Sequence, residues 1–225
     1  MKAMILAAGR GERLRPLTDE TPKPLLKVAG KSLIQINIEA LARAGIAEFV
    51  VNTAWLASEL HSALGDGQAL GVSITFSDEG AAALETGGGL RRALPLLGDE
   101  PFWLVNGDVL CDYRYTAYDL PAGMLAHLLL VPNPQHNLAG DFALQDGLIR
   151  ENAADLPRYT FAGISVVHPD LIRASTSPSE TFPLAPLLRA AASEGKVSGE
   201  LHEGLWIDIG TAERLAEANA ILRKS

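Results

Sequence analysis

Residues 2–26 read KAMILAAGRGERLRPLTDETPKPLL, and this stretch decides what fold and what kind of ligand to expect. The apolar run at 2–7 predicts a buried strand, and the two glycines behind it let the backbone turn tightly and approach a ligand. Four cationic side chains follow the run, namely Arg10, Arg13, Arg15 and Lys23. Close backbone N–H groups together with local positive charge predict a binding site for a polyanion.

The composition narrows the kind of polyanion. The chain has 225 residues, 48% of them hydrophobic, and its formal net charge is -8. A chain of this length and hydrophobic content predicts one domain, residues 1–225, with a sizeable core. Nucleic acids and membrane surfaces require a wide basic face, which an acidic chain is not expected to offer. The positive charge near the N-terminus therefore predicts a small anionic ligand, with no nucleic acid and no membrane as partner.

Cysteine usage and the apolar runs indicate the compartment. Cys111 is the only cysteine, so the chain forms no internal disulfide and no cysteine zinc cluster, which fits a reducing cytoplasm. Residues 1–8 are too short an apolar run for a signal peptide. The apolar run at 124–131 is far below the roughly 20 residues that a membrane span needs. We expect a cytoplasmic protein.

Strand-like and helix-like segments alternate in the first half of the chain. Short apolar runs that end in turn residues predict strands, and longer runs with helical spacing that end at glycine predict helices. We expect strands at 2–7, 48–53, 72–77 and 102–107, and helices at 32–45, 55–65 and 88–98. Such alternation is typical of a mostly parallel sheet with helices on both faces.

The pattern changes after residue 111. Consecutive strand-like runs joined by turns predict a smaller antiparallel extension of the sheet. We expect these strands at 124–131, 140–145, 147–151 and 159–168, with helices at 182–194 and 211–223. The fold class predicted is therefore α/β with a mixed, mostly parallel sheet. We expect the last helix only to pack against the rest, and we expect His127 and His168 to be core or strand-end residues.

The segment GRGERL at 9–14 also partly matches a dinucleotide-binding fingerprint. Leu14 stands where the third glycine belongs, and the second strand ends in Asn52 and Thr53, where an acidic ribose partner belongs. A GxG alone is equally typical of a tight turn. Both absences disfavour a nicotinamide-dependent oxidoreductase, which stays an alternative.

Two motifs together carry a more specific resemblance. LAAGxGxRLxPLT at 6–18, followed by PKPLL at 22–26, resembles the signature of the sugar-1-phosphate nucleotidyltransferases. The resemblance continues through LETGGGL (84–90), VNGD (105–108) and WIDIGTAERL (206–215), and so spans essentially the whole chain. It implies a Rossmann-like fold in which 1–111 mainly bind nucleotide and 112–225 mainly bind sugar and supply a second metal ligand. Within the family, the short chain and LETGGG are most similar to the N-acetylmuramic acid 1-phosphate uridylyltransferases.

The chemistry of such a family explains the cations. A nucleoside triphosphate and a sugar 1-phosphate meet, and in-line attack on the α-phosphorus is stabilised electrostatically. The resemblance implies that Arg13 holds the leaving pyrophosphate and that Lys23 bridges the α-phosphate and the sugar phosphate. It places Ala8, Gly9 and Gly11 against the nucleotide. A general base is not required, because a phosphate monoester with a second pKa of about 6 is already mostly dianionic at neutral pH.

Asp108 and Asp208 are the predicted ligands of Mg²⁺. Both stand in apolar runs, where an isolated carboxylate is costly and must be paired, capping or bound to metal. Two carboxylates give the hard oxygen ligation that Mg²⁺ takes. The alternatives are a turn or helix cap at Asp108 and an N-terminal helix cap at Asp208.

Further nucleotide contacts are expected at Glu12, Glu79, Thr86 and Gly87. Glu12 departs from the Thr or Ser of many relatives, so only its N–H is expected near phosphate. The Glu79 carboxylate could accept the uracil N3–H, or it could be a solvated loop residue. Thr86, Gly87 and Gly88 could approach the base or ribose, or could simply begin a glycine-rich helix.

The sugar is expected to contact neutral and acidic acceptors. The positions that match sugar-binding residues of relatives are Asn106, Gly140, Asp141, Glu151 and Gly163, although hairpin ends show similar residues. Arg150 and Arg158 could hold the lactyl carboxylate of N-acetylmuramic acid, or be solvated. The expected substrates are UTP and N-acetylmuramic acid 1-phosphate. Alternatives are mannose 1-phosphate with GTP, glucose 1-phosphate with dTTP or UTP, and an inactive regulatory relative; the oligomeric state stays open.

Overall fold

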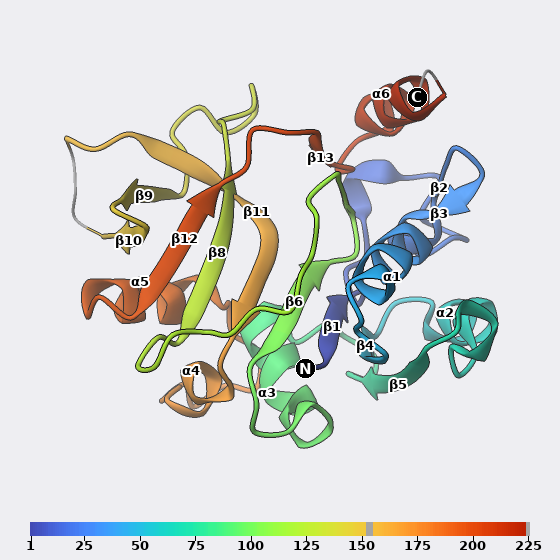
Figure 1. Ribbon diagram of the computed structural model, residues 1–225. Helices are drawn as coiled ribbons and strands as arrows, with labels where there is room; N and C mark the ends of the chain where they lie inside the picture. Colours follow the sequence, from blue (N-terminus) through green and yellow to red (C-terminus); the bar gives the residue numbers. More distant parts are fainter. Residues whose placement is uncertain (152–154, 224–225) are drawn as a thin grey trace.

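One mixed sheet joins the two halves of the chain (Figure 1). The structure is a computed structural model that describes residues 1–151 and 155–223. Within those ranges nine strands form this sheet, in the order β5-β4-β1-β6-β11-β8-β12-β10-β9. The halves meet where β6 pairs with β11.

The first half confirms the predicted alternation of strands and helices. The strands run parallel to one another, because each pair is connected by a crossover that contains a helix. The strands are β1 (Ala3–Leu6), β4 (Glu48–Thr53), β5 (Ser73–Asp78) and β6 (Phe102–Asn106), and the helices are α1 (Leu33–Arg43), α2 (Ala57–Leu64) and α3 (Glu85–Leu97). The carboxyl ends of these four parallel strands therefore lie at one edge of the sheet, where open α/β folds bind ligands.

The second half forms the predicted antiparallel extension. Its strands are β8 (Ala126–Val131), β9 (Phe142–Gln145), β10 (Leu148–Arg150) and β11 (Arg158–Val167). β11 runs antiparallel to both β6 and β8, and β9 and β10 form a hairpin.

One central strand of this half, β12 (Val197–Leu201), was not predicted, and it runs parallel to β8. Gly199 in its middle weakens the strand pattern in the sequence. A Cβ at that position would lie 2.7 Å from Ile149 Cδ1 and 3.1 Å from Leu128 O, so the close approach of the neighbouring chains requires glycine there.

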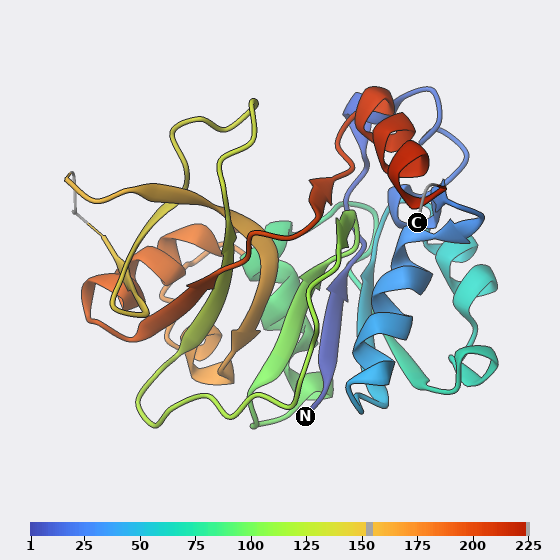
Figure 2. The same cartoon turned by 45° about the horizontal axis from the view of Figure 1, so that its top comes forward.

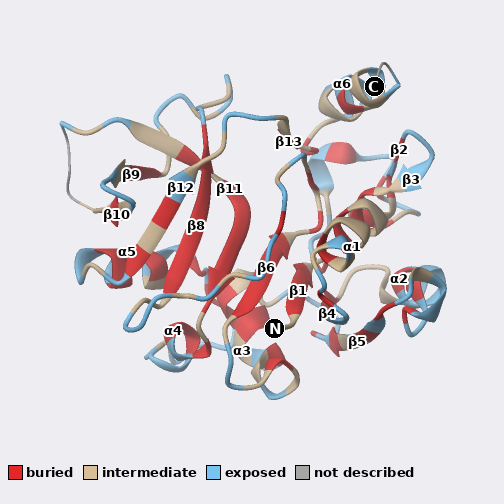
Figure 3. Cartoon of the chain, viewed as in Figure 1, coloured by how far each residue is buried: buried red, intermediate tan, exposed pale blue. Residues whose placement is uncertain are grey.

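Helices cover both faces of the sheet. One face packs against α1 and α2 and against residues 113–120, and the other packs against α3, α4 (Pro169–Arg173) and α5 (Ala185–Ser193). Figure 3 shows the central strands buried along most of their length. Burial on both faces explains why these strands appear in the sequence as continuous apolar runs.

A third apolar cluster lies beside the ligand edge of the sheet. Helix α6 (Ala212–Leu222) packs there against Leu14, Leu26 and Val28, with β13 (Trp206–Asp208) next to it. Figure 2 shows α6 beside the opening segment of the chain, although the two are far apart in sequence. The cluster thus fixes the C-terminal motif WIDIGTAERL against the N-terminal one.

Five further elements that the sequence did not predict are all short. They are α4, β7 (Val109–Cys111), β13, β2 (Lys27–Val28) and β3 (Lys31–Ser32), each too short to show a period. Helix α3 begins at Glu85, three residues before the predicted start at 88, because the glycines of LETGGGL lie inside the helix. In the described part of the chain, we find no helix with the length and apolar content that crossing a bilayer demands.

Candidate active site

A cavity of about 450 Å³ opens beyond the ends of β1 and β6. It is lined by the loop that follows β1, by Lys23, and by the ends of β4, β5 and β6. The structure brings ten of the predicted site residues to its wall, namely Ala8, Gly9, Gly11, Glu12, Arg13, Lys23, Glu79, Thr86, Asn106 and Asp108. The opening motif and the VNGD motif therefore share one hollow.

The loop after β1 is held in one conformation from several sides. Gly11 has a φ of 66°, and a Cβ there would lie 3.0 Å from Thr18 Cγ2 and 3.2 Å from Lys23 Cβ. The Thr18 hydroxyl donates to Gly11 O at 2.8 Å, and Leu14 is buried below the loop. Arg13 lies between these anchors, in a short 3-10 turn (Glu12–Leu14). A fixed loop presents Arg13 to the cavity at little entropic cost.

Asn52 is a lining residue that sequence reasoning missed. Its side chain is buried, accepts a hydrogen bond from Ala7 N at 2.7 Å and donates one to Glu79 Oε1 at 2.7 Å. The signal was present, since an amide in the apolar run EFVVNT needs a partner.

Glu79 is buried, and each of its carboxylate oxygens already accepts a hydrogen bond. The donors are Asn52 Nδ2 and Leu84 N, the latter at 2.6 Å from Oε2. The alternative of a solvated loop glutamate is therefore wrong. Glu79 ties the loop that precedes α3 to the end of β4.

The glycines of LETGGGL mainly serve packing. Thr86 lines the cavity, whereas Gly87 lies against Phe182, whose ring carbon Cε2 is 2.4 Å from where a Cβ would stand. A Cβ on Gly88 would lie 2.1 Å from Glu180 O. The structure therefore explains Gly87 by the approach of the 180–182 segment, not by a place along the cavity.

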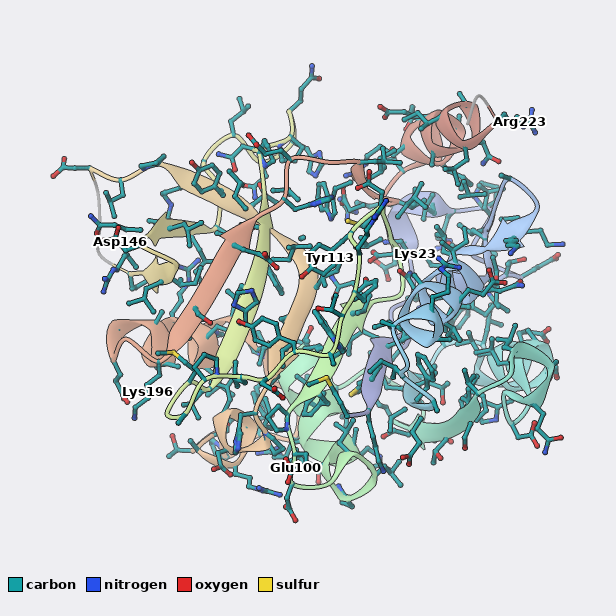
Figure 4. All side chains as sticks on the ribbon, in the orientation of Figure 1. Lys23, Glu100, Tyr113, Asp146, Lys196 and Arg223 are labelled. Carbon is teal, nitrogen blue, oxygen red and sulfur yellow. The ribbon has the colours of Figure 1, made fainter. Side chains whose placement is uncertain are left out.

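Lys23 and Asp108 meet across the cavity as an ion pair. Pro22 and Pro24 enclose the lysine in a short 3-10 turn (Lys23–Leu25), which fixes the backbone beneath it. Figure 4 shows Lys23 beyond the ends of β1 and β6. Asp108 comes two residues after the end of β6, so the pair joins the PKPLL and VNGD motifs.

Asp208 reaches the same region through β13. This strand pairs antiparallel with β7, with Asp208 opposite Val109, and Ile209 N donates to Asp108 O at 2.8 Å. Asp108 immediately precedes β7 and Asp208 ends β13, so the two aspartates lie at the same end of this short ladder, and of the two only Asp108 lines the cavity. The N-cap of α6 is Thr211, which excludes the capping alternative for Asp208.

Arg214 and His136 surround the Asp208 carboxylate. Arg214 Nη1 donates to Asp208 Oδ1, and His136 Nε2 lies 3.2 Å from the same oxygen. The prediction that the last helix only packs is wrong, because α6 carries this arginine. The sequence offered a signal for Arg214, which is the one cation of the motif WIDIGTAERL. It offered none for His136, whose partner, Asp208, lies 72 residues further along the sequence.

The two aspartates suit a hard divalent cation. Carboxylate oxygens, here from two aspartates at the same end of one ladder beside the cavity, are the donors that Mg²⁺ prefers. Cys111, at the end of β7, offers sulfur, which Mg²⁺ does not prefer as a ligand. Its thiol is also unsuited to nucleophilic attack, because burial raises its pKa to about 11.

The predicted sugar residues divide into two groups. Asn106 lines the cavity and packs on Gly163, where a Cβ would lie 2.5 Å from Asn106 Nδ2. The other three lie in a network between β9, β10 and β11, away from the cavity wall: Gly140, Asp141 and Glu151.

That network satisfies its own polar groups. Asp141 accepts from Phe161 N at 2.8 Å, Arg189 Nη1 contacts both Glu151 oxygens at 2.8 and 3.0 Å, and Arg158 Nη2 donates to Asp141 O at 2.6 Å. The structure therefore does not bring these three predicted residues together with Asn106. The adjoining segment, residues 152–154, lies outside the described residues.

Comparison with known proteins gives the family. The family model described as nucleotidyl transferase matches residues 2–119. The chain belongs to this nucleotidyl transferase family. The match covers the two motifs that line the cavity, so the resemblance predicted from the sequence is confirmed.

Two curated relatives match this nucleotidyl transferase along its whole length. An N-acetylmuramate alpha-1-phosphate uridylyltransferase of Neisseria meningitidis is 51% identical over 98% of this chain and 98% of its own. One of Caulobacter vibrioides is 34% identical over 99% and 97%. A mannose-1-phosphate guanyltransferase of Kluyveromyces lactis is 30% identical over 93% of this chain but only 61% of its own.

Solved structures confirm the predicted fold. A Bacillus anthracis protein described as a glucose-1-phosphate thymidylyltransferase superposes with a TM-score of 0.86, at 24% identity, over 100% of this chain and 96% of its own. A UDP-glucose pyrophosphorylase complexed with UDP-glucose gives 0.77 at 20% identity, over 100% and 99%. The Rossmann-like α/β arrangement is thus shared with enzymes whose sequences have diverged widely.

Proposed function

We propose that the chain transfers the uridylyl group of UTP to N-acetylmuramic acid 1-phosphate, giving UDP-N-acetylmuramic acid and pyrophosphate. The observation that carries the transfer is the convergence of Arg13, Lys23 and Asp108 on one cavity. The substrate pair rests on the similarity to the Neisseria meningitidis and Caulobacter vibrioides uridylyltransferases along the whole chain.

Arg13 and Lys23 carry the electrostatic part of the reaction. In the attack on the α-phosphorus, negative charge moves onto the pyrophosphate that leaves, and Arg13 is placed to stabilise it. Lys23 neutralises the repulsion between the α-phosphate and the incoming sugar phosphate. The backbone at Ala8, Gly9, Gly11 and Glu12 lies along the phosphates, where the open wall leaves room for them. The sugar phosphate needs no base, because it is already mostly dianionic with a second pKa of about 6.

Asp108 and Asp208 would hold Mg²⁺. The ion would supply positive charge that orients the triphosphate and offsets the charge developing on it. The protein's own part is to present Asp108 from the cavity wall and Asp208 from the adjoining end of β13, where Ile209 N donates to Asp108 O.

The base and sugar contacts follow from the remaining cavity wall. Thr86 and the loop held by Glu79 are proposed to contact the uracil and ribose, with Glu79 fixing that loop. Asn106 and Gly163 are proposed to bind the sugar ring, with the Asp141 and Glu151 network behind them. For the lactyl carboxylate we propose Arg150, whose Nε is buried with no hydrogen-bond partner, ahead of Arg158, which is bound to Asp141 O.

The setting follows from the substrates. N-acetylmuramic acid is a sugar of peptidoglycan, so its activated form fits the recycling of cell-wall sugars. We place the reaction in the cytoplasm, where UTP is available.

A second pair, mannose 1-phosphate with GTP, is favoured by the guanyltransferase similarity at 30% identity. A catalytically inactive role is disfavoured by the four charged residues, Arg13, Lys23, Asp108 and Asp208, all present with their elements in place.

A substrate panel tests the proposal. UTP, dTTP and GTP are each combined with N-acetylmuramic acid, N-acetylglucosamine, glucose and mannose 1-phosphates, and pyrophosphate release is followed with Mg²⁺. We expect the highest kcat/KM for UTP with N-acetylmuramic acid 1-phosphate. A higher value for GTP with mannose 1-phosphate, or for dTTP with glucose 1-phosphate, would leave the transfer chemistry standing and refute the substrate pair.

A further inference from the structure

Each of the two aspartates at the site is paired with a cation of this chain. Lys23 bonds Asp108, and Arg214 bonds Asp208. All four side chains are at most 28% exposed, so water screens these pairs less than it screens surface pairs. Two charges that would serve a metal ion are thus balanced by two that would serve phosphates.

Arg214 also lies next to the pyrophosphate-binding arginine that we propose. A Cβ added to Gly210, a residue of the cavity wall, would lie 2.4 Å from Arg214 Nη2 and 3.2 Å from Arg13 Nη2. Both guanidinium groups therefore approach the cavity at the same glycine. Two guanidinium groups this close repel each other unless an anion lies between them. Asp208 bonds to the Arg214 guanidinium but not to that of Arg13.

The start of α6 fixes the position of Arg214. The Thr211 hydroxyl caps the helix and accepts a hydrogen bond from Arg214 N at 3.4 Å, so the arginine lies in the first turn of α6. Its side chain can reach Asp208, behind it in the sequence, and the cavity wall at Gly210. A planar guanidinium donates several hydrogen bonds in a fork that matches phosphate oxygens.

From this geometry we propose that Arg214 is a second triphosphate-binding residue, which holds Asp208 in the metal-free protein and transfers to phosphate oxygens when metal and nucleotide bind. Lys23 makes the same exchange from Asp108. The inference rests on the proposed function and names a residue and a binding order that it does not contain.

The binding order follows from the charges. A free divalent cation must displace Lys23 and Arg214 from their carboxylates and leaves them without an anion. The metal–UTP complex supplies phosphate oxygens for both released cations while its metal takes the carboxylates. Metal and nucleotide therefore bind with positive coupling, each raising the affinity for the other by the same factor.

Binding of Mn²⁺, followed by the electron paramagnetic resonance of the free ion, tests this exchange without turnover. After the Mn²⁺ that UTP binds in a protein-free titration is subtracted, we expect wild-type protein to bind Mn²⁺ at least about tenfold more tightly with UTP present than without it. In Arg214→Gln, Mn²⁺ alone should bind about tenfold more tightly, because a competing cation is gone, while UTP measured with Mn²⁺ should bind about tenfold more weakly.

Two further variants are matched controls. Arg214→Lys keeps the charge and should keep the weak binding of Mn²⁺ alone. Arg223→Gln changes an exposed arginine at the end of the same helix and should leave both affinities at the wild-type values. Circular dichroism of each variant establishes that the fold is retained.

Unchanged Mn²⁺ and UTP affinities in Arg214→Gln would overturn the inference. Weaker binding of Mn²⁺ alone would also overturn it, since that result would make Arg214 a support of the metal site. Failure of the proposed function is distinguishable: wild-type protein would then bind no UTP with metal, while the Mn²⁺ titration without nucleotide would still test the pairing of Arg214 with Asp208.

Discussion

The cavity beyond β1 and β6 and the network between β9, β10 and β11 hold two sets of predicted site residues, and the structure arranges these two sets differently. At the cavity, two residues of the opening stretch, Arg13 and Lys23, meet Asp108 of the VNGD motif, which lies far away in the sequence. In the other region, Asp141 and Glu151 bond to main chain and to Arg189. The charged side chains of the first region line an open cavity, where Lys23 and Asp108 pair with each other, whereas those of the second region bond to main chain and to Arg189 away from the cavity wall. The predictions below test that distinction.

The largest effect is expected at the carboxylates. Asp108→Asn and Asp208→Asn should each cost several kcal/mol of barrier, roughly a thousandfold in kcat, because charge that stabilises a dry phosphate site is lost. Turnover is measured over a range of Mg²⁺, with circular dichroism as the fold control. Near-normal turnover at limiting Mg²⁺ would remove that aspartate from the metal site.

A somewhat smaller loss is expected at the cations. Arg13→Ala and Lys23→Ala should each lower kcat/KM by at least about a hundredfold, since each removes an electrostatic contact to developing charge. Lys27→Ala, an exposed lysine four residues beyond Lys23, is the matched control and should keep wild-type kinetics. If Lys23→Ala also did so, the PKP lysine would be only structural.

The supporting network should respond more weakly. Glu151→Gln breaks the ion pair with Arg189, whose side chains are 19% and 39% exposed, and should lower kcat/KM for the sugar phosphate by less than about tenfold. The KM for UTP should not change. Glu203→Gln, at an exposed position, is the control. A hundredfold loss in Glu151→Gln would mean that this carboxylate binds substrate directly, and the contrast between the two regions would disappear.

A packing change should affect stability more than chemistry. Alanine usually stabilises a helix relative to glycine, but in Gly88→Ala the new Cβ would meet Glu180 O at 2.1 Å. We expect a loss of about 1–3 kcal/mol in the free energy of unfolding, measured by urea denaturation. Arg92→Ala, an exposed position on the same helix, should stay within about 0.5 kcal/mol of wild type. An increase in the stability of Gly88→Ala would show that the 180–182 segment shifts to make room for the new Cβ.

The smallest effect concerns His127, which lies under Tyr118 and beside Ser198. Burial lowers its pKa from the ordinary 6.5, although Glu200 opposes the shift. The unfolded chain therefore binds more protons below pH 6.5, so His127 contributes its full stability above that pH and loses it as the pH falls toward the folded-state value. Urea denaturation between pH 7 and pH 5 should show a shallower decline in His127→Gln than in wild type; an equal decline would contradict the assignment.

The parts of the fold that the sequence predicted are those with a period. β1, β4 and β6 are apolar runs buried on both faces, and α1 shows helical spacing, so their residue types alone indicate them. β7 and β13 have three residues each and exist because they pair with one another. Such pairing depends on residues about a hundred positions apart, which no local pattern records.

The same physical reason divides the site. Arg13 and Lys23 belong to a loop whose glycines and prolines fix it locally, so their place at the cavity could be predicted. His136 and Arg214 reach Asp208 only after the second half of the chain has folded around β13. For Asn52, the sequence could predict that the side chain is buried, but it could not predict the hydrogen-bond partners, Ala7 N and Glu79.

The most direct test of the central claim follows the phosphorus atoms of UTP. The protein is incubated with Mg²⁺, N-acetylmuramic acid 1-phosphate and UTP labelled with ³²P at either the α- or the γ-position, and the products are separated. Attack on the α-phosphorus predicts that the α-label appears in UDP-N-acetylmuramic acid and the γ-label in pyrophosphate, in equal amounts. Label from the γ-position in the sugar product or in inorganic phosphate would contradict nucleotidyl transfer at this cavity.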